Sequence, residues 1–152
     1  MRFYFMDSSA VVKRYSVEAG SVFVHHLLAD PSAILYASRL ARIETLCALA
    51  RKKKEGHLSI QDFAQIRQQF LYEWEFRMRR LNVTEPVWER AASLGETHVL
   101  RSLDAIHLAT VLDWLPTIPM QKATAVSLVT SDGQLLDAAR REGLDVVDPA
   151  TV

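Results

Sequence analysis

Hydrophobic residues in this chain occur in two patterns that alternate along its length. Short apolar runs stand at residues 2–6 (RFYFM), 33–38 (AILYAS) and 123–131 (ATAVSLVTS). Runs of this length are typical of strands that are buried on both faces of a parallel sheet. We predict strands at these three places, and two shorter strands at residues 78–83 (MRRLNV) and 144–147 (LDVV).

Between these runs, apolar residues recur every three or four positions, which predicts helices. In residues 39–54, for example, Leu40, Ile43, Cys47 and Ala50 follow this spacing. Helix starts and ends are indicated by residues that commonly cap helices. The predicted helices cover residues 8–16, 17–29, 39–54, a stretch from Ser59 onward, 86–98, 102–115 and 133–142. The residues expected to cap helices are Ser59, Thr84, Ser102 and Gly143. We expect a loop at residues 116–120.

The alternation of strands and helices predicts the fold class, a three-layer α/β/α sandwich with a mainly parallel central sheet. The chain has 152 residues, of which 49% are hydrophobic and 24% are charged. A chain of this size and composition can bury a sizeable core and lacks the bias of a disordered or fibrous protein. We therefore expect residues 1–152 to form a single domain.

Composition excludes several classes of function. The single cysteine, Cys47, cannot form an internal disulfide or, alone, a thiolate cage for zinc. A lone cysteine fits a reducing cytoplasm, and no apolar run approaches the roughly 20 residues needed to cross a bilayer, so we expect a cytoplasmic protein without membrane contact. The 18 basic residues balance the 18 acidic ones, so any attraction for a polyanion must be local. The two dense basic runs, at residues 51–54 and 77–80, are by default solvated helix faces.

Two aspartates follow predicted strands at the edge where α/β sheets bind their ligands. Asp7 comes after the strand at residues 2–6, and Asp132 comes after the strand at residues 123–131. Ligands of open α/β sheets bind outside the carboxyl ends of the strands, so these two carboxylates could approach each other. The plainer interpretation is that each aspartate caps the helix that follows it.

Two further acids lie on predicted helices among apolar neighbours. Glu44 has Leu40 and Ala48 four residues away on either side. Burying an unpaired carboxylate costs several kcal/mol, so Glu44 must meet a cation or several donors; Arg42 or Arg51 could be that cation. Asp104 lies near the start of an apolar helix, where the helix dipole alone could explain a negative charge. It could equally point into a cleft.

Four converging acids would require a counter-charge. Two like charges about 4 Å apart repel by roughly 4 kcal/mol at an effective dielectric of 20, so a carboxylate cluster needs protons or divalent cations at neutral pH. Oxygen ligands alone select hard ions, Mg²⁺ or Mn²⁺, rather than zinc. Carboxylate-held Mg²⁺ engages phosphates and can activate a water for attack on a phosphodiester.

The four acids lie in segments that resemble a known family. YFMDSSAVVKRY around Asp7, RLARIETLCALAR around Glu44, LRSLDAIHLATVL around Asp104 and SLVTSDGQLLDAA around Asp132 are similar to the four acidic motifs of the PIN domain, and most closely to those of its VapC-like toxins. Each motif alone is an acid in an apolar frame. Their order and spacing along nearly the whole chain make the resemblance specific.

The resemblance implies a function and a partner. It implies a magnesium-dependent endoribonuclease in which Mn²⁺ can substitute, acting as the toxin of a type II toxin–antitoxin pair. Such toxins are usually homodimers, and a small antitoxin whose tail enters the acidic cleft neutralises them. By the same resemblance, Asp7, Asp104 and Asp132 would hold the metal, and Glu44 would orient or deprotonate the attacking water.

Two hydroxyl residues and one histidine complete the expectations for the site. Ser9 and Thr130 match hydroxyl positions of the family motifs and would support the acids. His107, on an apolar helix, is expected to be a hydrogen-bonded core residue rather than a catalyst.

Three alternative functions compete with the nuclease. Phosphatases with an aspartate nucleophile have a second aspartate two residues after the first. This chain has Ser9 at that position, which disfavours a phosphatase. A phosphorelay receiver would need an acidic pair near the first strand, a phospho-acceptor aspartate at the end of a later central strand and a lysine further on. Only Asp7 meets one of these requirements. The remaining alternative is a PIN-like module that binds RNA or protein without cutting, although such a module has no reason to keep four mutually repelling charges.

Overall fold

A five-stranded parallel sheet forms the centre of the molecule, in a computed structural model that describes residues 2–118 and 126–152. The strand order is β3-β2-β1-β4-β5. The strands are β1 (Arg2–Met6), β2 (Ala33–Ser38), β3 (Met78–Leu81), β4 (Val126–Val129) and β5 (Asp145–Val147). The helices are α1 (Ser8–Val12), α2 (Ser21–Ala29), α3 (Leu40–Lys54), α4 (Ile60–Phe76), α5 (Glu85–His98), α6 (Ser102–Trp114) and α7 (Gly133–Arg141). Two short 3₁₀ helices, η1 (Lys13–Tyr15) and η2 (Leu115–Thr117), follow α1 and α6.

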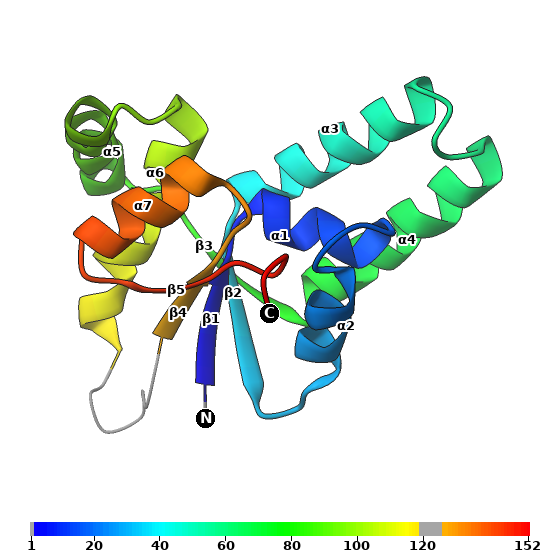
Figure 1. The fold of residues 1–152 in the computed structure, drawn as a ribbon, viewed down its shortest axis with the longest axis horizontal. Helices are drawn as coiled ribbons and strands as arrows, with labels where there is room; N and C mark the ends of the chain where they lie inside the picture. Colours follow the sequence, from blue (N-terminus) through cyan, green and yellow to red (C-terminus); the bar gives the residue numbers. More distant parts are fainter. Residues whose placement is uncertain (1, 119–125) are drawn as a thin grey trace.

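Helices cover both faces of the sheet, which confirms the predicted three-layer α/β/α sandwich with a parallel sheet. Helices α1 to α4 pack on one face, and α5, α6 and α7 pack on the other (Figure 1). Successive side chains of a strand point to opposite faces. On β1, Phe5 therefore enters the core beneath α5 to α7, while Met6 enters the core beneath α1 to α4. Both side chains are fully buried.

Strand β1 is the central strand of the sheet. Phe3 pairs with Ile34 of β2 on one side and with Val126 of β4 on the other. The backbone N–H of Asp7 continues this pairing by donating to the carbonyl of Val129, over 3.2 Å. The carboxyl ends of β1 and β4 therefore lie side by side, which is the arrangement that could bring the aspartates after them together.

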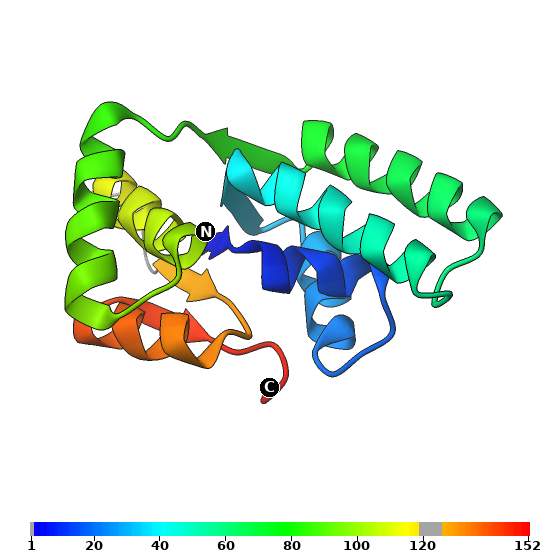
Figure 2. The same cartoon turned by 90° about the horizontal axis from the view of Figure 1, so that it is seen from above.

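Helices α3 and α4 form a long antiparallel pair that extends away from the sheet (Figures 1 and 2). The face of α3 that packs inward carries Ala41, Thr45 and Leu49, which are buried. Ile43 and Cys47, whose spacing predicted the helix, are exposed. The apolar spacing thus identified the helix but not its buried face, because the buried side of α3 is the side that contacts α1 and α4.

Most predicted elements are present, with differences at their ends. Helix α2 starts at Ser21 instead of residue 17, because Gly20 adopts φ +90° and ends a turn there. Ser59 caps α4 as predicted, by accepting the Asp62 N–H, but Ser102 does not cap α6: the N-cap is Arg101, and Ser102 is the first helical residue. Thr84 stands at the N-cap of α5 without a side-chain capping bond.

The predicted loop at residues 116–120 and the predicted strand at residues 123–131, which contains β4, are only partly within the described residues. The predicted loop at residues 116–120 begins with the end of η2, and residues 119–125, which include the start of the strand expected at 123–131, lie outside the described residues. Among the helices of residues 2–118 and 126–152, none combines the length and apolarity needed to span a bilayer.

Candidate active site

All four acids selected from the sequence line one cavity at the carboxyl edge of the sheet. The cavity has a volume of about 580 Å³. Its walls come from the start of α1, from α3, from the first turn of α6 and from the N-cap of α7, so segments far apart in the chain meet there. The lining residues are Asp7, Ser8, Ser9, Glu44, Arg101, Ser102, Leu103, Asp104 and Asp132.

Asp7 is the most deeply buried of the four acids, at 2% exposed. Its Oδ1 accepts hydrogen bonds from the N–H of Ala10 (3.0 Å) and the hydroxyl of Ser9 (2.8 Å), and its Oδ2 accepts one from Thr130 (2.7 Å). Burial raises the pKa of Asp7, and the nearby His107 and these donors only partly oppose the shift. Asp7 is thus both the N-cap of α1 and a cavity residue, so the two interpretations of the sequence do not exclude each other.

Ser9 and Thr130, the two expected supporting residues, tie the first and last acidic segments together. Besides its bond to Asp7, the Ser9 hydroxyl accepts the N–H of Ser131 (2.9 Å) and lies 3.3 Å from the Thr130 hydroxyl. Thr130 in turn accepts the N–H of Asp132 (3.1 Å). This hydroxyl pair therefore fixes Asp7 relative to Asp132.

Glu44 reaches the cavity from α3 with both carboxylate oxygens hydrogen-bonded. The Ser8 hydroxyl donates to its Oε2 (2.6 Å), and Nε2 of His107 lies 2.6 Å from its Oε1. Burial alone would raise the pKa of Glu44, but His107 and Ser8 outweigh burial and hold the pKa below its ordinary value. These partners replace Arg42 and Arg51, which the sequence had suggested as the counter-charge.

His107 is fully buried on α6, where the sequence placed a hydrogen-bonded core residue. Burial alone would lower its pKa, but the bond and charge of Glu44, together with Asp7 and Asp104, raise it. Because Glu44 is held as a carboxylate that can only accept, Nε2 must carry the proton of their hydrogen bond. Nδ1 of His107 is a buried atom that has no hydrogen-bond partner among residues 2–118 and 126–152.

Arg101 links the remaining two acids. Its Nε donates to Oδ2 of Asp104 (2.9 Å), and its Nη2 donates to Oδ2 of Asp132 (2.6 Å). Burial raises the pKa of Asp104; Arg101 partly opposes this shift and the charge of Asp132 adds to it. Asp132 also caps α7 by accepting the N–H of Leu135 through Oδ1 (2.9 Å). Like Asp7, Asp132 is both a helix cap and a cavity residue.

The donor set of the cavity fits a hard divalent cation. Four carboxylates face one space, and the carboxylate oxygen is the ligand type that Mg²⁺ and Mn²⁺ prefer. Across residues 2–118 and 126–152, however, no three His, Cys, Asp or Glu side chains are grouped closely enough to hold an ion as they stand. Two of the acids are instead bridged by Arg101, so ion binding would require their side chains to rearrange.

Comparison with known proteins assigns the family. The PIN domain family model matches residues 4–141. The chain belongs to the PIN domain family. This PIN domain is also 33% identical over 112 residues to ribonuclease VapC45 of Mycobacterium tuberculosis, an alignment that covers 74% of this chain and 76% of that protein. The predicted membership of the PIN domain family and the resemblance of the sequence to VapC proteins are confirmed.

Solved structures share the fold of this PIN domain. A toxin–antitoxin complex from Klebsiella pneumoniae aligns with a TM-score of 0.64 and 20% identity, covering 98% of this chain and 99% of that one. The protein PAE2754 from Pyrobaculum aerophilum aligns with a TM-score of 0.66 and 16% identity, covering 96% and 91%. These likenesses confirm the predicted fold class.

Three residues whose side chains bond to acids of the cavity were not selected from the sequence as site residues. Ser8 directly follows Asp7, Arg101 precedes Asp104 by three residues, and His107 follows Asp104 by three residues, on the same face of α6. Their nearness in the sequence to selected acids was the available signal. For His107 the prediction of a buried, bonded residue was correct, but its partner is an acid of the cavity.

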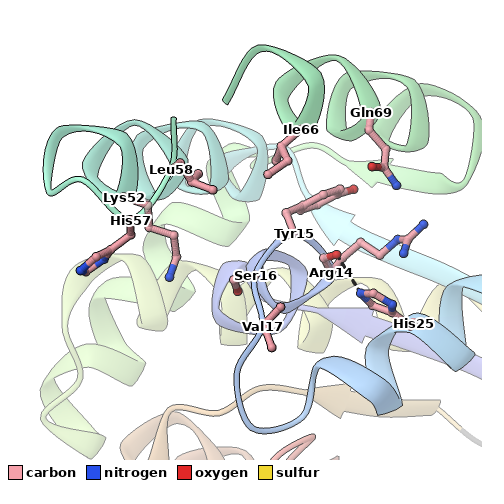
Figure 3. Close-up of a pocket in the computed structure, with 10 residues that line it drawn as sticks. All are labelled: Arg14, Tyr15, Ser16, Val17, His25, Lys52, His57, Leu58, Ile66 and Gln69. Atoms are coloured by element: carbon pink, nitrogen blue, oxygen red, sulfur yellow. Dashed lines mark hydrogen bonds between the residues drawn. The ribbon is translucent and has the colours of Figure 1, made fainter. Parts of the chain in front are cut away.

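A second cavity of about 580 Å³ lies between η1, α2 and the α3–α4 pair (Figure 3). Its lining combines basic side chains such as Lys52 with apolar and neutral polar ones, and none of the described lining residues is acidic. Its Arg14 is bound in a half-buried cluster around Glu73, which accepts bonds from the guanidinium of Arg14 (2.7 Å), the hydroxyl of Tyr15 (2.6 Å) and the amide of Gln69 (3.1 Å). The four acids selected from the sequence therefore line the first cavity, and none of them lines the second.

Proposed function

We propose that this PIN domain is a metal-dependent endoribonuclease that acts as the toxin of a toxin–antitoxin pair. The observation that carries the proposal is the meeting of Asp7, Glu44, Asp104 and Asp132 in one cavity at the carboxyl edge of the sheet. The relationship to a protein named ribonuclease VapC45 supports RNA as the substrate. The resemblance to toxin–antitoxin structures in fold agrees with this choice.

Asp7, Asp104 and Asp132 are the proposed metal ligands, and Mg²⁺ is the proposed ion, with Mn²⁺ as a substitute. When bound, the ion would lower the pKa of a water molecule and neutralise negative charge that builds up on the phosphodiester. The protein's own contribution is to hold these carboxylates in place. Asp7 receives three donors, and the Ser9 and Thr130 hydroxyls connect it to the segment of Asp132.

Glu44 is the proposed residue that orients the attacking water and accepts its proton. Its lowered pKa keeps it a carboxylate at neutral pH, which is the form that can accept a proton. The bonds from Ser8 and His107 fix the orientation of both oxygens, so Glu44 loses little freedom when a substrate binds. Glu44 comes from α3 and the proposed metal ligands from other elements, so they line different walls of the cavity.

An antitoxin and a second copy of the chain are the proposed partners. The antitoxin is proposed because the fold matches a structure described as a toxin–antitoxin complex. The homodimer is proposed from the resemblance of the sequence to VapC-like toxins. Purification with a small protein encoded beside this chain, followed by measurement of the mass of the complex, tests both partners together.

Cleavage of labelled RNA by the full chain tests the proposed activity. With Mg²⁺ or Mn²⁺, the parent protein should cut the RNA, and Asp7→Asn and Asp104→Asn should each abolish cutting without unfolding the protein. Asp113→Asn is the matched control, because Asp113 is exposed on the same helix as Asp104; it should cut like the parent. Cutting by Asp104→Asn at the parent rate would overturn the proposal.

The same proteins distinguish the enzyme from a binding module. A module that holds RNA without cutting it would bind the RNA equally well in the parent and in the asparagine variants, and none of them would release fragments. The parent should also stop bacterial growth when expressed, and Asp7→Asn should relieve that toxicity. Undiminished toxicity of the variant would mean that the cavity is not its source.

A further inference from the structure

Arg101 occupies the acidic cavity in a way that the proposed activity does not explain. It stands at the N-cap of α6, and its guanidinium spans from Asp104 on that helix to Asp132 at the N-cap of α7. Its two bonds, of 2.9 and 2.6 Å, are charge-assisted and take one carboxylate oxygen from each acid. Two of the three proposed metal ligands are therefore already paired with a cation from the same chain.

The backbone before Arg101 holds an unusual conformation. Val99 ends α5 with φ 54° and ψ 48°, and it is the only residue other than glycine with a positive φ in the described part of the chain. A β-branched residue in the left-handed region is a strained outlier. The N–H of Leu100 donates to the carbonyl of Gly95 (3.1 Å) and closes the turn. The chain thus accepts strain at the turn that brings Arg101 to the rim of the cavity.

A divalent cation and this guanidinium would compete for the same oxygens. Asp132 has its Oδ1 engaged by the cap of α7 and its Oδ2 engaged by Arg101. A carboxylate oxygen that binds a metal ion must direct a lone pair at the ion. A divalent cation beside the guanidinium of Arg101 would also be repelled by its positive charge. The side chain of Arg101 is 71% exposed, so it can swing into solvent without breaking the core.

We propose that Arg101 is a built-in counter-cation of the acidic cavity, which stabilises the ion-free protein and which a divalent metal ion must displace in order to bind. The inference rests on the proposed function, because it assumes that Asp104 and Asp132 hold a metal. It assigns to Arg101 a role opposed to that of the acids: its removal strengthens metal binding, whereas removal of an acid weakens it.

The size of the effect follows from the exposure of Arg101. Water screens both ion pairs, so each contributes little compared with a buried pair. We expect Arg101→Gln to bind Mn²⁺ about tenfold more tightly than the parent, which corresponds to about 1.4 kcal/mol. Arg101→Lys keeps the charge but loses the planar guanidinium that spans two carboxylates. Its affinity for Mn²⁺ should therefore lie between that of the parent and that of Arg101→Gln.

Titration calorimetry with Mn²⁺ on the full chain, without RNA, tests the inference. The proteins are the parent, Arg101→Gln, Arg101→Lys, Asp104→Asn and, as the matched control, Arg90→Gln, which removes the same charge from an exposed position on α5. Arg90→Gln should bind Mn²⁺ like the parent, and Asp104→Asn should bind it more weakly. Circular dichroism establishes that each variant is folded, and Arg101→Lys carries the test if Arg101→Gln is not.

The outcomes separate this inference from the proposed function. If the parent binds Mn²⁺ through Asp104 but Arg101→Gln binds with equal or lower affinity, the counter-cation is overturned while the metal site stands. If neither the parent nor Arg101→Gln binds Mn²⁺, both proposals are overturned. If the parent binds weakly and Arg101→Gln binds tightly, both are supported, and this result requires no cleavage assay.

Discussion

Replacement of His107 by leucine tests whether this buried histidine acts through Glu44. His107 is 0% exposed, and its Nε2 lies 2.6 Å from Oε1 of Glu44. Leucine fills a similar volume but cannot donate a hydrogen bond. Glu44 would then keep only the Ser8 hydroxyl as a donor. We expect the leucine variant to remain folded and to lose activity.

Two opposing effects determine the stability of this variant. The lost hydrogen bond to a charged group is worth about 1.5 to 3 kcal/mol. Against this, leucine removes the buried Nδ1 of His107, which has no hydrogen-bond partner in the part of the chain that the structure describes, and an unsatisfied buried polar atom costs about 1 to 3 kcal/mol. The free energy of unfolding should therefore change by no more than about 2 kcal/mol in either direction. Urea denaturation at neutral pH measures it.

The activity should change far more than the stability. A general base contributes roughly 10² to 10⁴ to a rate, and a misplacement of about 1 Å can cost 10²-fold. We expect His107→Leu to cut RNA at least about tenfold more slowly than the parent. His107→Gln is the matched control, because its amide N–H can replace the Nε2 donor, and it should keep more activity than the leucine variant.

A double-mutant cycle with Glu44→Gln identifies the route of the effect. If His107 acts through Glu44, adding His107→Leu to the Glu44→Gln variant should cause little further loss of cleavage. The reasoning would be refuted if His107→Leu cut RNA at the parent rate, or if it caused the same loss whether or not Glu44 was present.

Two further predictions concern parts of the molecule away from the acidic cavity. Burial alone would raise the pKa of Glu73, but its three donors hold the pKa below its ordinary value. Glu73→Gln should therefore lower the free energy of unfolding by about 2 kcal/mol at pH 7. This contribution is fully present above the unfolded pKa of about 4.3 and is lost as the pH falls through the depressed folded pKa, so in urea denaturation the parent and the variant should converge in acid. Gly20 has φ +90°, and an added Cβ would lie 2.7 Å from the backbone of Pro149. Gly20→Ala should lower the melting temperature more than Gly56→Ala, because at Gly56 φ is +79° but an added Cβ would have no described residue within 4 Å other than its chain neighbours; equal shifts would mean that backbone conformation alone decides the cost.

The sequence alone predicted the fold class and the edge of the sheet at which Asp7 and Asp132 lie. Apolar runs identify buried strands because a strand covered on both faces must be apolar throughout its length. Asp7 and Asp132 directly follow such runs, so their places at the carboxyl edge follow from local pattern and parallel pairing. Both are also helix caps, a dual role that the same local pattern allows.

Only the tertiary structure decided which groups face the acids. Glu44 is paired with His107, which lies 63 residues further along the chain, rather than with an arginine of its own helix. Arg101 also bonds to Asp132, which lies 31 residues further along the chain, and so bridges Asp104 and Asp132. The sequence pattern gave no sign of this bridge. Local periodicity reports which face of an element is apolar, but the packing of α3, α6 and α7 against the sheet determines which side chains meet across the cavity.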